Sequence, residues 1–215
     1  MLVLAGMVAS GKSTLSNRLA EHYNSKLFLE PVDDNPILPL YYDDMKRYGF
    51  LLQVYFLNKR FDIIKKAMEE ENAILDRSIY EDELFSSINL ELGNMTEIEF
   101  LTYKDLLNNM MEEIDERNKK VPELLIYLDI NFDKFLSNLK KRGREYEQID
   151  LNTEKGKKDL AYFKLLHNKY EEWFENYNKS PKIRINMNDI DVNKDEDFLY
   201  VLDLIEEKRK QTIER

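Results

Sequence analysis

The sequence contains no cysteine and little glycine or proline, six and five residues respectively among 215. Without cysteine the chain cannot form disulfides, thiolate zinc sites or a cysteine nucleophile. This composition suits a reducing compartment, and we expect the protein in the cytoplasm. No apolar run approaches the roughly 20 residues of a membrane-spanning helix, and the opening apolar run Met1–Ala9 has no basic residue before it. We therefore expect that run to contain a strand rather than a signal peptide, in a soluble protein.

The chain also lacks an excess of positive charge. Its formal net charge is −10 and its sequence pI is near 4.9. Such a surface repels the phosphate backbone of DNA or RNA, so nucleic-acid polymers and membranes are not expected as partners. A small anion can still bind where a few cations gather, and we expect small-molecule partners.

The pattern along the chain indicates an α/β protein. With no repeat, linker or low-complexity tract, residues 1–215 are expected to form one domain. Short runs typical of strands occupy Met1–Ala5, Lys26–Leu29, Ala73–Asp76, Leu124–Asp129 and Lys182–Ile185. Helical patterns occupy Ser13–Tyr23, Phe50–Glu71, Thr96–Arg117, Asp133–Arg142, Thr153–Asn176 and Asp195–Gln211. This alternation predicts a mainly parallel five-stranded sheet with helices on both faces, and ligands at the carboxyl ends of its strands.

The stretch GMVASGKST, residues 6–14, uses two of the six glycines. Gly6-x4-Gly11-Lys12-Ser13 matches the phosphate-loop pattern and stands between a predicted strand and a predicted helix, as that pattern requires. Backbone N–H groups of such a loop surround phosphate oxygens, Lys12 reaches the β- and γ-phosphates, and the Ser13 hydroxyl binds Mg²⁺. An ordinary glycine turn with a capping serine is the alternative, but the placement favours ATP or GTP binding. The expected nucleotide-binding residues are Gly6, Met7, Val8, Ala9, Ser10, Gly11, Lys12, Ser13 and Thr14.

Two predicted strands end in an aspartate that could assist Ser13 at the metal. Asp129 is better explained as a residue that starts the next helix. Asp76 is followed at once by Arg77 and Ser78, a turn suited to handling anions, so we assign the magnesium role to Asp76.

A further carboxylate, Glu30, ends the second strand within EPVDDNP. It could accept the proton of an attacking hydroxyl, although this segment alone favours the interpretation of a surface acid before a rigid turn.

Within FLLQVYFL, residues 50–57, Gln53 is one amide among apolar residues. A buried amide needs partners, and Arg60 lies two helical turns further along the same face. The pair could present hydrogen bonds to the edge of a base such as adenine or cytosine, whereas a bond from Gln53 to a nearby backbone carbonyl would be purely structural.

The basic run Lys140–Arg144 closes a predicted helix. Cations favour a helix C-terminus and Gly143 is an expected stop signal. A mobile lid whose arginines cover a transferring phosphoryl group explains the run equally well.

Together these stretches resemble the deoxynucleoside kinases, in particular the bacterial deoxyadenosine and deoxyguanosine kinases, which belong with thymidine and deoxycytidine kinases. GMVASGKST, EPVDDNP, FLLQVYF, DRSIYED and KKRGREYEQ follow the family's order and spacing from Leu2 to about Trp173, and the last helices are only generically similar. The resemblance implies a P-loop kinase fold with a helical lid at about residues 138–150. It further implies transfer of the γ-phosphate of ATP, with Mg²⁺, to the 5′-hydroxyl of a deoxynucleoside, preferably deoxyadenosine or deoxyguanosine and possibly deoxycytidine, in nucleotide salvage.

The resemblance also implies catalytic roles. Glu30 is the base for the 5′-hydroxyl, Arg77 positions Glu30 and the acceptor oxygen, and Asp76 helps to position Mg²⁺. Arg142 and Arg144 close over the phosphates.

On the substrate side, the resemblance implies that Tyr42 and Glu147 contact the sugar 3′-hydroxyl. Gln53 reads the base, and Arg60 and Asp82 pair nearby to tune purine against pyrimidine. These assignments permit more than one hydrogen-bonding pattern, so they do not select one deoxynucleoside.

One position departs from the family. Relatives usually carry another lid arginine one helical turn before Arg142, where this chain has Asn138. A neutral amide cannot neutralise phosphate charge, so weaker lid closure or donor binding is expected, and the choice between ATP and GTP stays open.

Two alternative functions use the same loop. A nucleoside monophosphate kinase resembling thymidylate kinase would share the fold but accept a phosphorylated substrate. A non-catalytic nucleotide-binding regulator would have no use for Glu30, Gln53 and Arg77 together.

Relatives pair as homodimers through helices, which makes the helix at 96–117 a candidate interface. Its stripe of Phe100, Tyr103, Leu107 and Met110 is explained equally well by core packing.

Overall fold

The computed structural model of the chain describes residues 1–30, 32, 34–116 and 122–213. Pro31 and Asp33 of the EPVDDNP segment, and Arg117 at the end of an expected helix, lie outside the described residues. Within these described ranges, every helix is too short or too polar to span a membrane.

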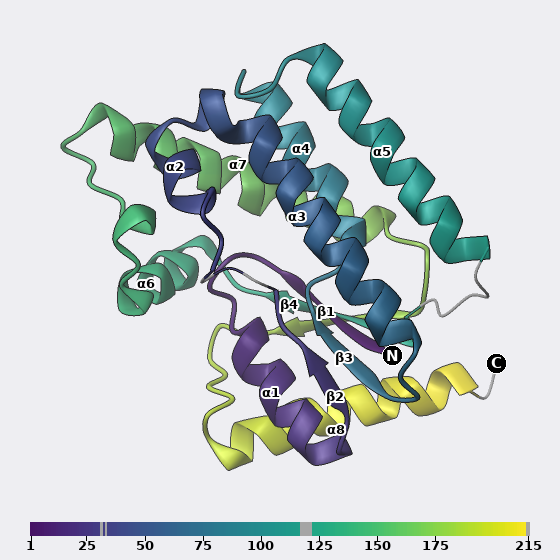
Figure 1. Cartoon of the computed structure of the whole chain (residues 1–215). Helices are drawn as coiled ribbons and strands as arrows, with labels where there is room; N and C mark the ends of the chain where they lie inside the picture. The colour runs from purple at the N-terminus through teal and green to yellow at the C-terminus, as the bar shows by residue number, and fades with distance from the viewer. Residues whose placement is uncertain (31, 33, 117–121, 214–215) are drawn as a thin grey trace.

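A parallel sheet forms the centre of the molecule (Figure 1). Among the described residues its five strands are β1 (Leu2–Gly6), β2 (Lys26–Phe28), β3 (Ala73–Asp76), β4 (Leu124–Asp129) and β5 (Lys182–Asn186). They lie in the order β2-β3-β1-β4-β5, and all pairs are parallel. β1, β3 and β4 are continuous apolar runs because both faces of a parallel sheet are covered. The predicted parallel five-stranded sheet is confirmed, within one residue at each strand end.

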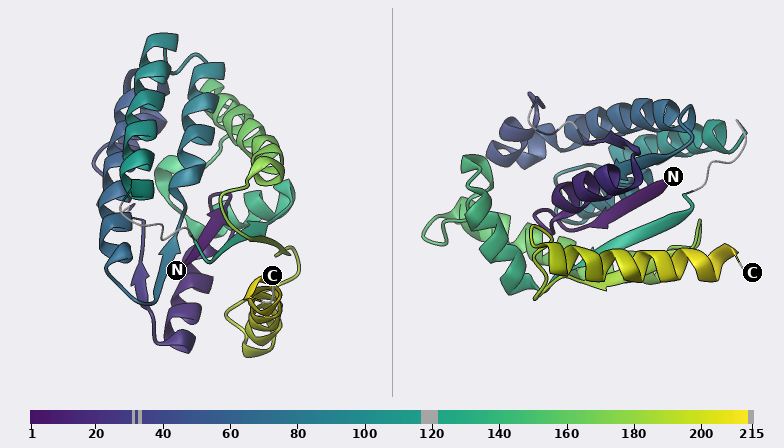
Figure 2. Two further views of the ribbon diagram at one scale, coloured as in Figure 1. Left: turned by 90° about the vertical axis from the view of Figure 1, so that its right-hand side faces the viewer. Right: turned by 90° about the horizontal axis from the view of Figure 1, so that it is seen from below.

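Helices cover both faces of this sheet. They are α1 (Lys12–Tyr23), α2 (Leu38–Asp43), α3 (Met45–Met68), α4 (Asp82–Glu91), α5 (Glu97–Glu116), α6 (Phe132–Arg142), α7 (Glu154–Asn176) and α8 (Asp195–Ile213). α1 and α8 lie on one face and α3, α4 and α7 on the other, while α5 packs outside α3 and α4 (Figure 1, Figure 2). α2 and α6 lie beyond the carboxyl ends of the strands, on the opposite side from both chain termini. The ends of the strands and the lid segment therefore face each other.

Short-range hydrogen bonds fix the helix that carries the lid residues. The Asn131 side chain accepts a hydrogen bond from the Lys134 N–H at 2.8 Å and starts α6. Gly143 ends it with φ of 72°, a left-handed conformation that favours glycine. Arg142 is therefore the last residue of α6, and Arg144 follows in the extended segment before a short 3₁₀ helix, η2 (Glu145–Glu147).

One long helix begins earlier than the sequence predicts, and two helices were not predicted. α3 begins at Met45 rather than Phe50, because the Asp44 side chain caps it by accepting from the Arg47 N–H at 3.1 Å. The helix runs through Gly49, where a Cβ atom would lie 2.7 Å from the Asn94 carbonyl oxygen, so glycine permits a close backbone approach. α2 and α4 were not predicted because α2 has only six residues and α4 buries polar side chains that interrupt the apolar pattern.

The apolar stripe of α5 packs into the core. Tyr103 and Leu107 are buried, and Phe100 and Met110 are partly buried against the same core. Core packing therefore accounts for the buried part of this stripe.

Candidate functional site

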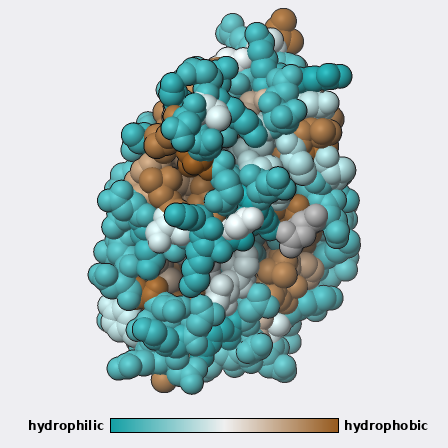
Figure 3. Space-filling model, turned by 90° about the vertical axis from the view of Figure 1, so that its left-hand side faces the viewer, coloured by the Kyte–Doolittle hydropathy of each residue, from teal (hydrophilic) through white to brown (hydrophobic). Residues whose placement is uncertain are grey.

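A cavity of about 750 Å³ lies at the carboxyl ends of the strands, where the five sequence segments meet. Every predicted site residue lines this cavity except Gly6 and Met7, the first two residues of the phosphate loop. Its volume is within the range of small-molecule sites. The face that bears α2 and α6 is mostly hydrophilic, and its apolar side chains show as separate patches (Figure 3). The prediction that these scattered segments converge is confirmed.

The phosphate loop joins β1 to α1. Gly6, Ala9 and Gly11 have φ of 137°, 58° and 98°, so the loop curls in a way that only its small residues readily permit. The buried Lys12 ammonium donates hydrogen bonds to the carbonyl oxygens of Gly6 at 2.8 Å and Met7 at 2.7 Å. Burial, and next the charge of Arg77, lowers the pKa of Lys12 to about 7. An anion bound beside it would favour its charged form.

Two oxygen ligands suited to magnesium adjoin each other beside this loop. The Ser13 hydroxyl donates to Asp76 Oδ2, which brings the first turn of α1 to the end of β3. Within the described part of the chain, Asp76 Oδ1 is buried and has no hydrogen-bond partner. Mg²⁺ prefers hard oxygen ligands and commonly takes one or two from protein, with phosphates and water completing its shell. Ser13 and Asp76 fit that ion.

Glu30 lines the cavity between two arginines. Its Oε2 accepts from Arg77 Nε at 2.9 Å, and its Oε1 is ion-paired with Arg60 Nη2. Arg60 also forms an ion pair with Asp82 through Nη1. The expected contacts of Arg77 with Glu30 and of Arg60 with Asp82 are present, whereas the pairing of Arg60 with Glu30 was not predicted.

These arginines determine the protonation of Glu30. Burial alone would raise the pKa of its carboxyl group, but the charges of Arg77 and Arg60 outweigh it and lower that pKa from 4.5 to about 2. Glu30 is therefore ionised throughout the neutral range.

Glu30 should make the stability of the fold depend on pH. Because its pKa is lower in the folded chain, its stabilising contribution is fully present above pH 4.5 and is lost as pH falls through about 2. At 1.36 kcal/mol per pKa unit this contribution is about 3 kcal/mol. Glu30→Gln should therefore unfold at lower urea than the wild type at pH 7, with a difference that narrows below pH 4.5. A constant difference from pH 7 to pH 3 would contradict this assignment.

Gln53 points its amide at the cavity. The side chain is 4% exposed and lines the cavity with Arg60. No hydrogen bond joins its amide to another of the residues that the structure describes. A hydrogen bond from Gln53 to a nearby backbone carbonyl, the structural alternative, is therefore not present among the described residues. The Gln53 amide is available to a ligand.

The lid residues converge on Glu147, which is 3% exposed. Arg142 Nη1 and Arg144 Nη1 lie 3.7 Å and 3.5 Å from its two carboxylate oxygens. Tyr42 is also buried here, and burial, followed by the charge of Glu147, raises the pKa of its hydroxyl group well above the usual value. The Tyr42 hydroxyl is therefore protonated and can donate.

Asn138 contacts the phosphate loop instead of facing solvent. Its Nδ2 donates to the carbonyl oxygen of Ala9 at 2.9 Å. The amide that replaces an expected arginine therefore joins α6 to the loop, close to a residue with positive φ.

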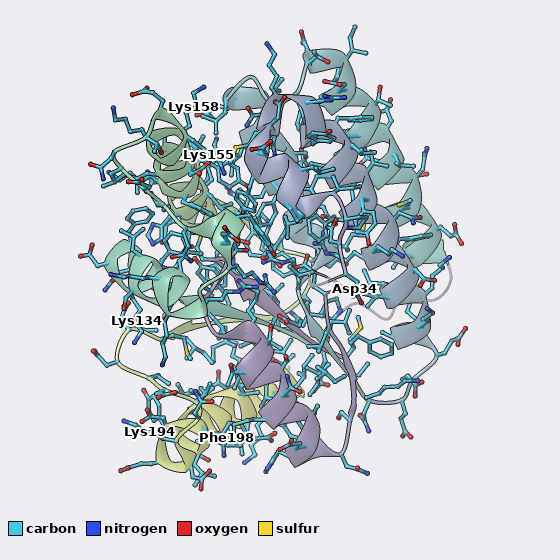
Figure 4. All side chains as sticks on the ribbon, turned by 60° about the vertical axis from the view of Figure 1, so that its left-hand side comes forward. Asp34, Lys134, Lys155, Lys158, Lys194 and Phe198 are labelled. Atoms are coloured by element: carbon cyan, nitrogen blue, oxygen red, sulfur yellow. The ribbon has the colours of Figure 1, made fainter. Side chains whose placement is uncertain are left out.

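The segment after β5 forms the remaining rim of the cavity. Val192 and Asn193 line it, and the Arg18 guanidinium of α1 donates to the Val192 carbonyl oxygen at 2.7 Å. Arg18 also lies 4.1 Å above the ring of Phe198, which belongs to the first turn of α8, on the side of α1 (Figure 4). Lys134 of α6 lines the same rim.

Sequence reasoning missed two buried residues behind the site, Glu81 and Tyr170. The Tyr170 hydroxyl accepts from Arg77 Nη1 at 2.9 Å and donates to Glu81 Oε1 at 2.8 Å. Glu81 also forms a capping box with Ser78. The pattern of serine followed three residues later by glutamate is a sequence signal for that capping box, but nothing in the sequence indicates Tyr170.

Comparison with known proteins gives consistent matches over almost the whole chain. A sequence profile of the family described as deoxynucleoside kinase matches residues 2–209. The chain is 45% identical over 212 residues to a deoxyguanosine kinase of Lactobacillus acidophilus, covering 98% of this chain and 91% of the relative. It is 49% identical over 191 residues to a deoxyadenosine kinase of that organism, covering 89% and 87%. The solved structure of deoxyadenosine kinase from M. mycoides with bound dCTP matches with a TM-score of 0.78 at 30% identity, covering 96% of this chain and all of that one.

Proposed function

The chain belongs to the deoxynucleoside kinase family, and from this premise we propose that it transfers the γ-phosphate of ATP to the 5′-hydroxyl of a purine deoxynucleoside. Deoxyadenosine and deoxyguanosine are the proposed substrates, with deoxycytidine accepted more weakly. The observation that carries the proposal is that Glu30, fixed by Arg77, lines the same cavity as Lys12. The carboxylate that would accept the hydroxyl proton and the loop that would bind the triphosphate therefore line the same cavity.

In the proposed mechanism the phosphate loop binds the triphosphate. Lys12 and the loop N–H groups contact the β- and γ-phosphates, where the helix N-terminus adds positive potential. Ser13 and Asp76 would hold Mg²⁺, which neutralises charge on the phosphates when bound. Arg142 and Arg144 lie on the lid side of the cavity and stabilise negative charge on the phosphoryl oxygens.

Glu30 orients the 5′-hydroxyl and accepts its proton. A carboxylate with a pKa of about 2 is a weak base. Phosphoryl transfer passes through a loose transition state, in which positioning and charge stabilisation provide most of the rate. A weak base in a fixed position is sufficient for that chemistry, because the hydroxyl becomes more acidic as its bond to phosphorus forms.

The nucleoside occupies the inner part of the cavity in this proposal. Tyr42 and Glu147 bind the sugar 3′-hydroxyl, and Gln53 reads the base with its amide. Arg60 lies between Glu30 and Asp82 and so connects the base-reading region to the reacting one.

The proposal is tested with the four deoxynucleosides and thymidine monophosphate as acceptors, each with ATP and with GTP as donor. We expect the highest kcat/KM for deoxyadenosine or deoxyguanosine and none above background for thymidine monophosphate. Transfer to the monophosphate alone would indicate a nucleoside monophosphate kinase. Tight ATP binding without transfer to any acceptor would indicate a nucleotide-binding regulator.

Gln53→Ala should weaken recognition of the nucleoside while leaving the donor site intact. Loss of a hydrogen bond to the base corresponds to about a tenfold rise in KM for the preferred deoxynucleoside. The KM for ATP should stay within about twofold of the wild type, since Gln53 belongs to α3 and the proposed phosphate contacts come from the loop before α1. Steady-state kinetics measures both constants. The control is Asn58→Ala, an exposed amide on the same helix, and equal KM values for the two variants would contradict the role of Gln53.

Three broader features complete the proposal. We propose that residues 1–215 form a single domain, that the protein works as a homodimer, and that it is cytoplasmic. Ile98 and Leu101 on α5 are 78% and 53% exposed and are available to a second copy. The absence of cysteine supports the location.

A further inference from the structure

Glu81 is a fully buried carboxylate that contacts both halves of the site without lining the cavity. It ends the 3₁₀ helix η1 (Ile79–Glu81), which follows β3, and it is 0% exposed. Its Oε1 accepts from the Gly6 N–H at 3.1 Å, from Arg77 Nη1 at 3.2 Å and from the Tyr170 hydroxyl at 2.8 Å. Its Oε2 accepts from the Ser78 N–H at 2.9 Å. One carboxylate thus joins the phosphate loop, the turn after β3 and helix α7.

The backbone that Glu81 contacts is strained at the arginine beside Glu30. Arg77 has φ of 117°, a conformation that non-glycine residues rarely adopt and that persists only where surrounding contacts fix it. Glu81 supplies such contacts on both sides of this residue, to the Arg77 guanidinium through Oε1 and to the next N–H, that of Ser78, through Oε2. Glu81 therefore helps to fix both the strained backbone and the direction of the Arg77 side chain.

The same oxygen also fixes the start of the phosphate loop. Gly6 has φ of 137° and pairs with Leu128 of β4 in the sheet, where a Cβ atom would lie 2.6 Å from the Leu128 carbonyl oxygen, so this backbone is held close to β4 and admits only glycine. Glu81 Oε1 accepts from the Gly6 N–H and from Arg77. The distance from the loop to the arginine that positions Glu30 is thus set through a single atom.

Tyr170 completes this arrangement from α7. Its hydroxyl accepts from Arg77 and donates to Glu81, so it fixes the direction of both groups. Burial, and next the charge of Glu81, raises the pKa of the Tyr170 hydroxyl well above its usual value, which keeps it a donor. Neither Tyr170 nor Glu81 lines the cavity, so neither is placed to touch a substrate.

We propose that Glu81 and Tyr170 are positioning residues that set the spacing between the phosphate loop and Arg77, and hence between the γ-phosphate and the 5′-hydroxyl. The inference rests on the proposed function, which places the nucleoside beside Glu30 and Arg77. A displacement of about 1 Å between reacting groups lowers a rate about 10²-fold while binding is largely retained. These residues should therefore act on kcat and not on the KM of either substrate.

The first test compares Glu81→Gln with the wild type well below the unfolding temperature of the variant. We expect kcat to fall about 10²-fold, with the KM for deoxynucleoside and for ATP within about threefold of the wild type. A lower unfolding temperature with unchanged kcat per folded molecule would show a purely structural role and overturn the proposal. Failure of the proposed function gives a different result, because the wild type would then transfer phosphate to none of the four deoxynucleosides. Equal turnover by Glu81→Gln and the wild type would overturn only the positioning role of Glu81.

The second test does not depend on Glu81→Gln folding. Tyr170→Phe removes one hydroxyl group and keeps the ring, and we expect about a tenfold loss of kcat. Tyr177→Phe is the matched control, because Tyr177 is also buried and its hydroxyl is hydrogen-bonded to Ser180 Oγ at 2.8 Å rather than to Arg77 or Glu81. The proposal predicts that only Tyr170→Phe lowers kcat. Equal kcat values for the two tyrosine variants would overturn it.

Discussion

Glu30→Gln is expected to lower the turnover number about 10³-fold, within the range assigned to general acid–base catalysis. The amide has the size of the carboxylate but cannot accept the proton of the 5′-hydroxyl, and it leaves Arg77 and Arg60 without their anionic partner. Deoxynucleoside affinity should change less than the rate does, since Gln53, Tyr42 and Glu147 are untouched. The decisive measurement is the single-turnover rate of phosphoryl transfer at saturating concentrations of both substrates.

The pH dependence gives this prediction a second readout. Because the pKa of Glu30 is about 2, its ionisation should not limit the wild-type rate between about pH 6 and 9. Asp34→Asn is the matched control, an exposed acid in the same segment, labelled in Figure 4. It should retain wild-type turnover. A Glu30→Gln enzyme as active as the wild type across pH 6 to 9 would show that Glu30 is not the base.

The fold was largely predictable because buried strands and helices have characteristic patterns of apolar residues in the sequence. β1, β3 and β4 are covered on both faces, so they appear as continuous apolar runs ending at identifiable residues such as Asp76 and Asp129. Long helices such as α7 show an unbroken 3.6-residue pattern. α4 does not, since it buries the polar residues Ser86 and Asn89 among its apolar ones. Hydrogen bonds within α4 satisfy Ser86 and the Asn89 Nδ2, and the Tyr41 hydroxyl of α2 donates to Asn89 Oδ1. Hydrophobic periodicity gives no sign of these bonds.

The position of the site was predictable from topology. Parallel strands end at one edge of the sheet, so residues just after β1, β2 and β3 had to meet, and Lys12, Glu30 and Asp76 do. Which side chains then pair was less predictable. The contact of Arg60 with Glu30 joins α3 to the end of β2, and Tyr170 reaches Arg77 from α7. Such contacts depend on side-chain length and direction across packed elements, for which the sequence gives no spacing rule.

Asn138 shows the same limit at a single position. The sequence identifies it as the amide that stands where relatives usually carry an arginine, and predicts only lost charge. The structure adds a hydrogen bond from Asn138 to the Ala9 carbonyl oxygen, which connects α6 to the phosphate loop. With one cation fewer on α6, the lid's share in stabilising the transition-state charge comes from Arg142 and Arg144 in the proposed mechanism.

Arg142→Ala should therefore have an effect comparable to that of Glu30→Gln. Arginines that contact a transferring phosphoryl group contribute about 10³- to 10⁵-fold to turnover, and we expect a loss on the order of 10³-fold. Arg142 is the last residue of α6, its side chain is 30% exposed, and it lines the cavity with a long ion pair of 3.7 Å to Glu147. Such a weak contact leaves the guanidinium free to move towards a phosphate. Glu147 keeps its contact with Arg144, so deoxynucleoside binding should be nearly unchanged.

The comparison with Lys140→Ala separates this specific role from a general loss of positive charge. Lys140 is an exposed cation on the same helix and does not line the cavity. Lys140→Ala therefore changes the net charge by the same amount as Arg142→Ala but leaves the phosphate site unchanged. Rapid-quench measurement of a single turnover, together with the dissociation constant of the deoxynucleoside, should give a slow rate with normal binding for Arg142→Ala alone. An unchanged single-turnover rate for Arg142→Ala would show that Arg142 of the lid does not take part in phosphoryl transfer. The basic run Lys140–Arg144 would then serve only to end α6.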